Sequence, residues 1–288
     1  MAVATLSRNG NSIELPLLGE DSGELLIGVD HGKPEAGGAA LGGLDPIWGD
    51  FQSQMQTYTL GVRFTDSSAY NDAIDLADMI KSHSQGNNLI LDLPVDEYDS
   101  NIPVAPAAGQ SEAVNFAYNP GTTDYVDAEL GLTRVENIFA ASNPPSNHVV
   151  DTTPVSGSGP ITLSNGSKTV EFNAGVSVER SVGRPNSSVD SKYKQWPDYQ
   201  DNIQAAYDAF EFGFQIVDNA VSDTGDLIEM VTTRMGRSAL TLDFNGIFNL
   251  GSYDVAPDGS GALRTARLSG RTEWTESPRL TLRVIEGR

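Results

Sequence analysis

One strand–helix–strand pattern occurs twice in this chain, and it constrains the fold more than any other feature of the sequence. Over residues 58–64, large apolar residues alternate with small or polar ones, which predicts a β-strand. Apolar residues then recur at helical spacing up to Ile80, and two-residue alternation resumes over residues 89–93. The same order returns over residues 210–244, where DLIEMV aligns with DLADMI and LTLDF with LILDL without a gap. Two matching units predict a tandem duplication.

The segments around this unit also correspond in the two parts of the chain. Residues 5–15 predict a hairpin with an Asn-Gly turn, and residues 162–172 repeat it. After the central unit, a second pair of strands is expected in each copy. The first pair covers residues 113–118 and 125–135 across an Asn-Pro-Gly turn, and the second covers residues 263–274 and 280–284 with a turn near Ser277 and Pro278.

Two long segments, residues 19–49 and 174–202, lack a core-like period and are interpreted as loops. Each carries a basic residue followed by proline and, later, a tryptophan with a nearby aromatic residue. These candidate inter-subunit contacts are Lys33, Pro34 and Trp48 in the first segment with Phe51 just after it, and Arg184, Pro185, Trp196 and Tyr199 in the second. The loops are expected to dock on a neighbouring molecule, or each tryptophan fixes its loop to its own sheet, and both can hold.

Residues 142–160 are rich in proline, serine, threonine and glycine, a composition typical of a linker. We therefore expect a first domain over residues 1–141 and a second over 161–288. Several strands follow one another without an intervening helix, which disfavours βαβ units. The predicted fold class is α+β: two tandem copies of a mainly antiparallel sandwich- or barrel-like β domain with one flanking helix.

The chain is strongly acidic, with 39 Asp and Glu against 18 Lys and Arg and a formal net charge of −21. Together with few lysines and much glycine and aspartate, this composition resembles that of proteins from salt-loving archaea and their viruses, where salt screens self-repulsion. An ordinary acidic protein is the alternative. The charge disfavours tight DNA binding, which requires clustered basic residues. Neither a signal peptide nor a membrane-spanning run is predicted.

The residues that carry chemistry in enzymes are sparse and scattered. There is no cysteine, and the three histidines, His31, His83 and His148, stand in unrelated contexts without a partner at metal-ligand spacing. Asp92 and Asp243 occupy equivalent positions and are interpreted as residues on the wet face of a sheet rather than paired acids or a calcium site. We expect no catalytic, metal or cofactor site and predict that the chain is not an enzyme.

Small acidic groups elsewhere have simple structural interpretations. Asp223, Thr224 and Asp226, near the start of the second helix, are expected to cap the helix or to oppose its dipole. Asp96, Glu97 and Asp99 could collect a cation, although the EF-hand pattern is absent.

The doubled strand–helix–strand unit, with its early hairpin, long loop and closing hairpin, resembles the tail-tube fold of long-tailed viruses. The segment Leu163–Phe172 is similar to the opening of such tail proteins. The resemblance implies sheets that join side by side around a channel, helices outside, and loops that reach adjacent rings. It also implies a virion tail location, assembly in the host cytoplasm, and other tail proteins as partners.

Three chains of two units would form a pseudo-sixfold homotrimeric ring through which DNA passes without specific binding. The first expectation is a tail-tube ring, and a distal-tail or tail-tip (baseplate) ring is an alternative. An alternative of another class is a carbohydrate-binding β-sandwich module that uses Trp48 and Trp196. An enzyme is the least favoured class.

Overall fold

The computed structural model describes most of the chain, with gaps. The described residues are 2–18, 24–31, 54–81, 89–94, 100–106, 113–119, 125–135, 138–139, 155–172, 174–183, 186–189, 198–201, 207–215, 220–232, 240–258, 263–267 and 275–285. We refer to residues 2–139 as the first half and to residues 155–285 as the second half.

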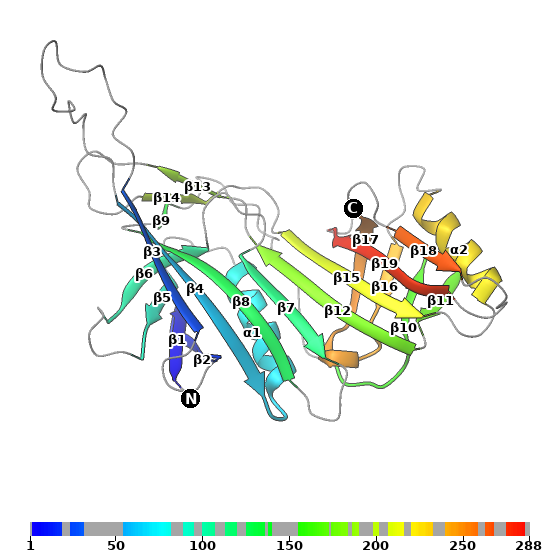
Figure 1. Cartoon of the computed structure of the whole chain (residues 1–288), viewed down its shortest axis with the longest axis horizontal. Helices are drawn as coiled ribbons and strands as arrows, with labels where there is room; N and C mark the ends of the chain where they lie inside the picture. Colours follow the sequence, from blue (N-terminus) through cyan, green and yellow to red (C-terminus); the bar gives the residue numbers. More distant parts are fainter. Residues whose placement is uncertain are drawn as a thin grey trace, which may run out of the picture.

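The first half is mostly β-structure with one helix packed on it (Figure 1). In chain order it forms β1 (Val3–Arg8), β2 (Asn11–Pro16), β3 (Glu24–His31), β4 (Gln54–Thr65), α1 (Ala69–Lys81), β5 (Leu89–Asp92), β6 (Ile102–Pro106), β7 (Val114–Asn119), β8 (Tyr125–Arg134) and β9 (Ile138–Phe139).

In its described residues the second half repeats this order of elements except for β9, and it adds a short hairpin and a 3₁₀ turn. It forms β10 (Ile161–Ser164), β11 (Thr169–Phe172), β12 (Ala174–Gly183), β13 (Asn186–Val189), β14 (Asp198–Asp201), β15 (Tyr207–Gln215), α2 (Ala220–Thr232), β16 (Leu240–Asp243), η1 (Ile247–Asn249), β17 (Ser252–Pro257), β18 (Leu263–Arg267) and β19 (Thr275–Val284). The fold is therefore a mostly antiparallel β-sheet protein with a helix in each half.

The strand pairings of the first half correspond to those of the second half. In the first half β1 pairs with β2 and β5, β5 with β6, and β8 with β4, β6 and β7, while β3 pairs with β4. In the second half β10 pairs with β11 and β16, β16 with β17, and β19 with β15, β17 and β18, while β12 pairs with β15. Every one of these pairings is antiparallel, as expected from the sequence.

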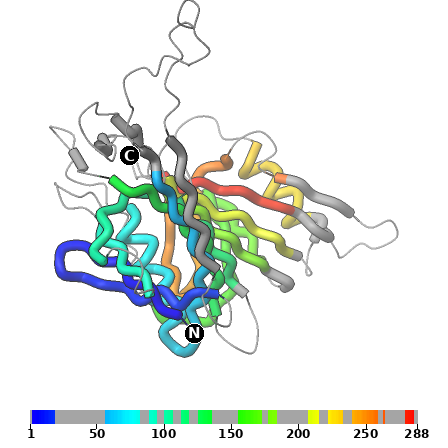
Figure 2. The backbone as a smooth tube through the Cα atoms, turned by 60° about the vertical axis from the view of Figure 1, so that its left-hand side comes forward, coloured from blue at the N-terminus to red at the C-terminus, as the bar shows by residue number. Residues whose placement is uncertain are grey.

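The two halves share one sheet because β7 pairs with β12. One row of strands therefore runs β3–β4–β8–β7–β12–β15–β19–β18, as Figure 2 shows from the cyan and green strands to the yellow and red ones. A separate small sheet joins β13, β14 and β9, where β9 pairs in parallel with β14.

The early hairpins confirm the turn chemistry read from the sequence. Asn9 and Gly10 both have positive φ, 54° and 84°, as a two-residue type I′ connection between β1 and β2 requires. In the second half, Asn165 Oδ1 accepts hydrogen bonds from the backbone N–H groups of Ser167 and Lys168 and closes the longer turn. The two strand–helix–strand units are also present, as β4–α1–β5 and β15–α2–β16.

The interpretation of residues 19–49 and 174–202 as loops is wrong in the parts that the structure describes. Residues 24–31 form β3, and residues 174–183 form β12, the strand at the centre of the sheet. The alternation over β12 was obscured because Arg180 occupies a buried position between Val178 and Val182. A charged residue at a core position hides a strand from a pattern based on apolar residues.

Two further strands differ from the expectation. The segment after Leu93, for which no strand is predicted from the sequence, contains β6, although that strand includes Pro103 and Pro106. The turn expected near Ser277 and Pro278 is absent, since both residues lie within β19 where its register with β18 shifts. An extra residue bulges from β19 there, which accommodates the missing proline N–H.

The described end of the linker, residues 155–160, runs along the second half without regular structure. Its contact with the β16–β17 connection is close, because a Cβ on Gly157 would lie 2.1 Å from the backbone oxygen of Asn245. The Val155 backbone N–H also donates to Asn249 O at 2.9 Å. This end of the linker is therefore docked on the second half.

The two halves fill a common hydrophobic core with different side chains. The first half buries mainly aliphatic residues, among them Leu6, Leu15, Leu60, Leu89 and Leu130. The second half packs a group of rings, with Phe172, Phe210, Phe212, Phe214, Phe244 and Tyr253 in mutual contact at centroid distances of 4.5–6.2 Å. One face of the sheet is thus apolar and covered, and the other faces outward.

Candidate functional site at the junction of the halves

A buried group of three charged side chains lies where the halves meet. We call Lys81, Arg180 and Asp208 the junction ion cluster. Arg180 donates from Nε and Nη2 to the two carboxylate oxygens of Asp208 at 2.9 and 2.7 Å, and Lys81 Nζ donates to Asp208 Oδ2 at 2.9 Å. All three side chains are at most 1% exposed.

The cluster ties together elements from both halves. Lys81 ends α1 in the first half, while Arg180 lies on β12 and Asp208 on β15 in the second. Arg180 also lies over the rings of Phe210 and Tyr253, at 5.1 and 5.8 Å from their centroids. Strand alternation places Arg180 and Asp208 on the covered face, and the end of α1 brings the ammonium group to them.

Electrostatics in this cluster hold the carboxylate ionised. Burial opposes ionisation of Asp208, but Arg180 and Lys81 outweigh that effect and lower its pKa to about 2. Burial lowers the pKa of Lys81, because its partner Asp208 only partly compensates and Arg180 repels it. Asp78, 3.8 Å from Lys81 Nζ, adds a second, partly exposed carboxylate. A cluster of this kind makes both halves depend on each other, since removal of one member leaves a buried charge without its partner.

A second contact between the halves comes from the connection between β16 and β17. Phe248 of η1 packs against Tyr70 of α1 and Tyr118 of β7, with ring centroids 5.4 and 5.0 Å apart. Asn249 Nδ2 donates to Asn71 Oδ1 at 2.9 Å. Phe248 has φ 56°, a left-handed conformation that costs a non-glycine residue energy and is retained here with the contact.

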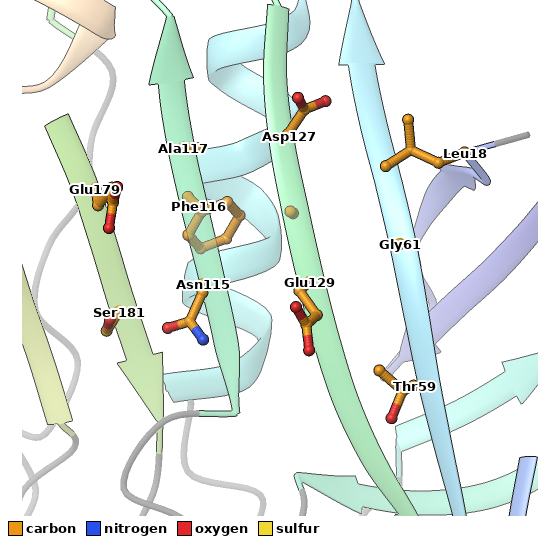
Figure 3. Close-up of a pocket in the computed structure, with 11 residues that line it drawn as sticks. Leu18, Thr59, Gly61, Asn115, Phe116, Ala117, Asp127, Glu129, Glu179 and Ser181 are labelled. Carbon is orange, nitrogen blue, oxygen red and sulfur yellow. The ribbon is translucent and has the colours of Figure 1, made fainter. Parts of the chain in front are cut away.

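The outward face of the sheet at the junction is acidic and slightly hollowed. A groove of about 380 Å³ crosses β4, β8, β7 and β12 there. Figure 3 shows the groove on the opposite side of the sheet from α1, with Asp127, Glu129 and Glu179 directed toward the viewer. Thr59, Asn115 and Ser181 supply polar, uncharged lining.

Only part of this negative charge is neutralised by neighbouring side chains in the described residues. Arg63 binds Asp127 through two hydrogen bonds of 2.6 and 2.8 Å, and Arg279 lies 2.8 Å from Glu211. Glu179 stands directly opposite Glu211 across β12 and β15. Like charges opposed in this way destabilise a sheet, an effect that salt reduces.

The residues singled out as candidate loop contacts fall mostly outside the described part of the chain. This holds for Lys33, Pro34, Trp48, Phe51, Arg184, Pro185 and Trp196. Tyr199 lies on β14, opposite Ser188 of β13 and Ile138 of β9. The loop contacts therefore stay a prediction.

Asp92 and Asp243, which occupy equivalent positions in the two halves, each accept a hydrogen bond from a backbone N–H group. Asp92 Oδ1 accepts from the Asn101 backbone N–H at 2.6 Å, and Asp243 Oδ1 accepts from that of Asn245 at 2.8 Å. On α2, Asp223 lies in the first turn as expected of a dipole partner, whereas Asp226 pairs with Lys168 at 2.6 Å. His31 lies on β3, while His83, His148 and residues 95–99 fall outside the described ranges.

Among the described residues, no group of three or more His, Asp or Glu side chains is arranged to hold a metal ion. No described helix combines the length and apolar character that crossing a bilayer requires. No protein-family model matches the chain, and no curated protein is similar to it in sequence.

The junction ion cluster was not found by sequence reasoning. Its members are separated by 28 and 127 residues along the chain, and nothing in the spacing connects them. A usable signal was present in each strand separately. Arg180 alternates with Val178 and Val182, and Asp208 with Phe210 and Phe212, so both charges fall on apolar faces.

Proposed function

We propose that this chain is a structural virion protein, without catalytic activity, that forms rings of a viral tail and encloses a channel for DNA. In this proposal the chain is a tandem duplication of a tail-tube-like domain, and three chains complete a pseudo-sixfold ring. The acidic composition favours a haloarchaeal virus as its source. The tail tube is the first candidate and a distal-tail or tail-tip ring the second.

The edge-to-edge junction of the halves carries this proposal. β7 and β12 pair over five residues and convert two sheets into one. β18 of the second half corresponds to β7, because β18 pairs with β19 as β7 pairs with β8. β3 of the first half corresponds to β12, because β3 pairs with β4 as β12 pairs with β15. Among the described strands, β18 and β3 each pair with one neighbour only, so each end of the row has an edge available.

The matching pairings of the halves support duplication. Seven pairings of the first half have a counterpart in the second, from the early hairpin to the closing pair of strands. A row of related units that expose complementary edges is suited to a head-to-tail contact, which closes into a ring when the rotation per unit divides a full turn.

The charge of the outward face supports a channel. The side of the sheet opposite α1 carries Asp127, Glu129 and Glu179, and it would line the interior if the row of strands closed with its helices outside. A negative wall repels DNA phosphates, so a duplex could move past it without being held.

The test is assembly of the purified chain in molar salt. Light scattering is expected to give a trimer or a larger multiple, and electron microscopy hollow rings or tubes. Stacked tubes support the tail tube, whereas single rings support the tip ring. A chain that stays monomeric from low to molar salt at micromolar concentration would overturn the proposal.

A further inference from the structure

The junction inside the chain gives a template for a contact between chains. β7 and β12 pair from Val114 opposite Val182 to Tyr118 opposite Val178. Both strands also keep a fixed register with their neighbours within their own halves. The corresponding strands β18 and β3 can therefore be aligned through the strands they flank. Leu263 and Arg264 lie before the register shift with β19, and the remaining residues of β18 follow by their position along β18 itself.

We propose that β18 of one chain pairs with β3 of a second copy of this chain, antiparallel and in the register of β7 and β12. The inference rests on the ring proposed above and specifies which edges meet and how. It predicts five residue pairs, with Leu263 opposite Val29 at one end and Arg267 opposite Leu25 at the other.

The register follows from the backbone pairings. Val114 lies opposite Leu130, which lies opposite Leu60. In the second half Leu263 lies opposite Leu280, which lies opposite Phe212. Leu263 therefore takes the position of Val114 in its half.

The same steps align β3 with β12. Leu25 lies opposite Leu60, and Val178 lies opposite Phe212. Leu25 thus takes the position of Val178, and Val29 takes the position of Val182. β18 is five residues long, the length over which β7 and β12 pair, so the whole strand is used.

The direction of the strands allows this contact to repeat. Each neighbouring pair in the row from β3 to β18 is antiparallel, and the row has eight strands. With an even number, an incoming β3 that is antiparallel to β18 places the next chain in the same orientation as the first. The contact is then heterologous, the kind that builds cyclic rings.

The side chains near the proposed contact between β18 and β3 differ from those near the junction of β7 and β12 within one chain. The positions that correspond to Arg180 and Asp208 hold Ile27 and Gln56, because Ile27 pairs with Tyr58 as Arg180 pairs with Phe210. The helix alignment that matches Met79 with Met230 puts Thr232 in the place of Lys81. The contact between chains therefore lacks the ion cluster. β18 brings Arg264 and Arg267 to it, whereas the five paired residues of β3, from Leu25 to Val29, are uncharged.

Disulfide trapping tests the register, because the natural chain has no cysteine. Leu26 and Ala266 correspond to Glu179 and Ala117, which lie opposite each other on the outward face. A Leu26→Cys, Ala266→Cys chain is expected to give covalent trimers on a denaturing gel after mild oxidation. Asp30→Cys with Ala266→Cys is the matched control, since the change moves one cysteine four residues, about 13 Å, along the same face.

We expect at least about ten times more cross-linked chain from the first variant than from the control, since the control cysteines lie beyond disulfide reach. Mixing the two single variants, Leu26→Cys and Ala266→Cys, before assembly should give disulfide dimers and no larger covalent species. Equal cross-linking in both double variants, or a link formed within one chain, would overturn the pairing.

Light scattering of the reduced variants and of the natural chain separates this inference from the proposed function. Rings that form without the expected cross-link overturn the register and leave the ring intact. A natural chain that remains monomeric in molar salt overturns both. Circular dichroism of each reduced variant shows that a missing cross-link does not come from a misfolded chain.

Discussion

The two halves use the same strand pairings but stabilise corresponding places with different chemistry. Where the second half buries Arg180 and Asp208 against Lys81, the first half has Ile27 and Gln56 at the matching strand positions. Strand pairing is therefore compatible with either set. The charged set lies at the junction that is permanent within one chain, and the neutral set lies on the edge that we propose meets another chain.

Removal of the Asp208 carboxylate, which Arg180 and Lys81 share, should give the largest change in the free energy of unfolding. Asp208→Ala leaves Arg180 and Lys81 buried without their acceptor and should destabilise the protein by about 3–5 kcal/mol. Gln56→Ala, at the matching position of the first half, should cost less than about 1 kcal/mol. Chemical unfolding of both variants at one salt concentration measures the difference, and equal losses would remove the distinction between the halves.

The contact of η1 with the first half should give the next largest effect. Phe248→Ala removes a side chain that is 6% exposed, together with its packing on Tyr70 and Tyr118. We expect a loss of about 3 kcal/mol, within the range for a buried phenylalanine. Alanine offsets none of this loss, because it does not relieve the left-handed backbone. Ile247→Ala, a partly buried neighbour, is the control, and thermal unfolding gives the comparison. A smaller effect at Phe248 than at Ile247 would contradict the role of this contact.

Acid sensitivity should be concentrated at the junction. The pKa of Asp208 is about 2 in the folded protein against 3.8 for an unperturbed aspartate. A group whose pKa is lowered by folding stabilises the protein above its unfolded value, and this contribution is lost as the pH falls from about 4 through 2. The linked loss is roughly 2 kcal/mol.

Asp208→Asn should show a correspondingly shallower decline of the unfolding free energy over this pH range than the natural protein. Other carboxylates titrate in both proteins, so only the difference between the two curves reports on Asp208. Parallel curves would contradict the depressed pKa.

The smallest expected effect concerns the outward face. Glu179→Gln removes one member of the like-charge pair with Glu211 and should stabilise the protein by about 0.5 kcal/mol at 0.1 M salt. The gain should disappear at molar salt, where charges are screened within about 3 Å. Glu14→Gln, on an exposed position of β2 opposite Thr5, is the control. A gain that is independent of salt would show that repulsion is not its source.

The parts of the fold that follow from local rules were predictable. Asn9 and Gly10 determine a tight hairpin, and the alternation from Tyr58 to Phe64 continues as β4. The predictions failed where tertiary contacts override the local pattern. Arg180 is stable in the core only because Asp208 reaches it, so β12 did not look like a strand. The sequence predicts a turn near Pro278, but a bulge accommodates this residue inside β19.

The candidate site was less predictable than the fold. An acidic outward face follows from composition and alternation together, but the meeting of Lys81 with Asp208 depends on how one half is placed on the other. That placement comes from β7 and β12, whose pairing joins residues that are far apart along the chain, from Tyr118 with Val178 to Val114 with Val182. The sequence of neither strand indicates which other strand it pairs with.

Because β7 and β12 belong to one polypeptide, their encounter does not depend on how much protein the cell contains. A tether of a few tens of residues holds such partners at an effective concentration on the order of millimolar. A newly made chain can therefore form the pairing between β7 and β12 by itself, even when the concentration of other copies is low. In the ring that we propose, β3 and β18 meet other copies of the chain, so ring assembly would depend on protein concentration, whereas the pairing of β7 with β12 would not.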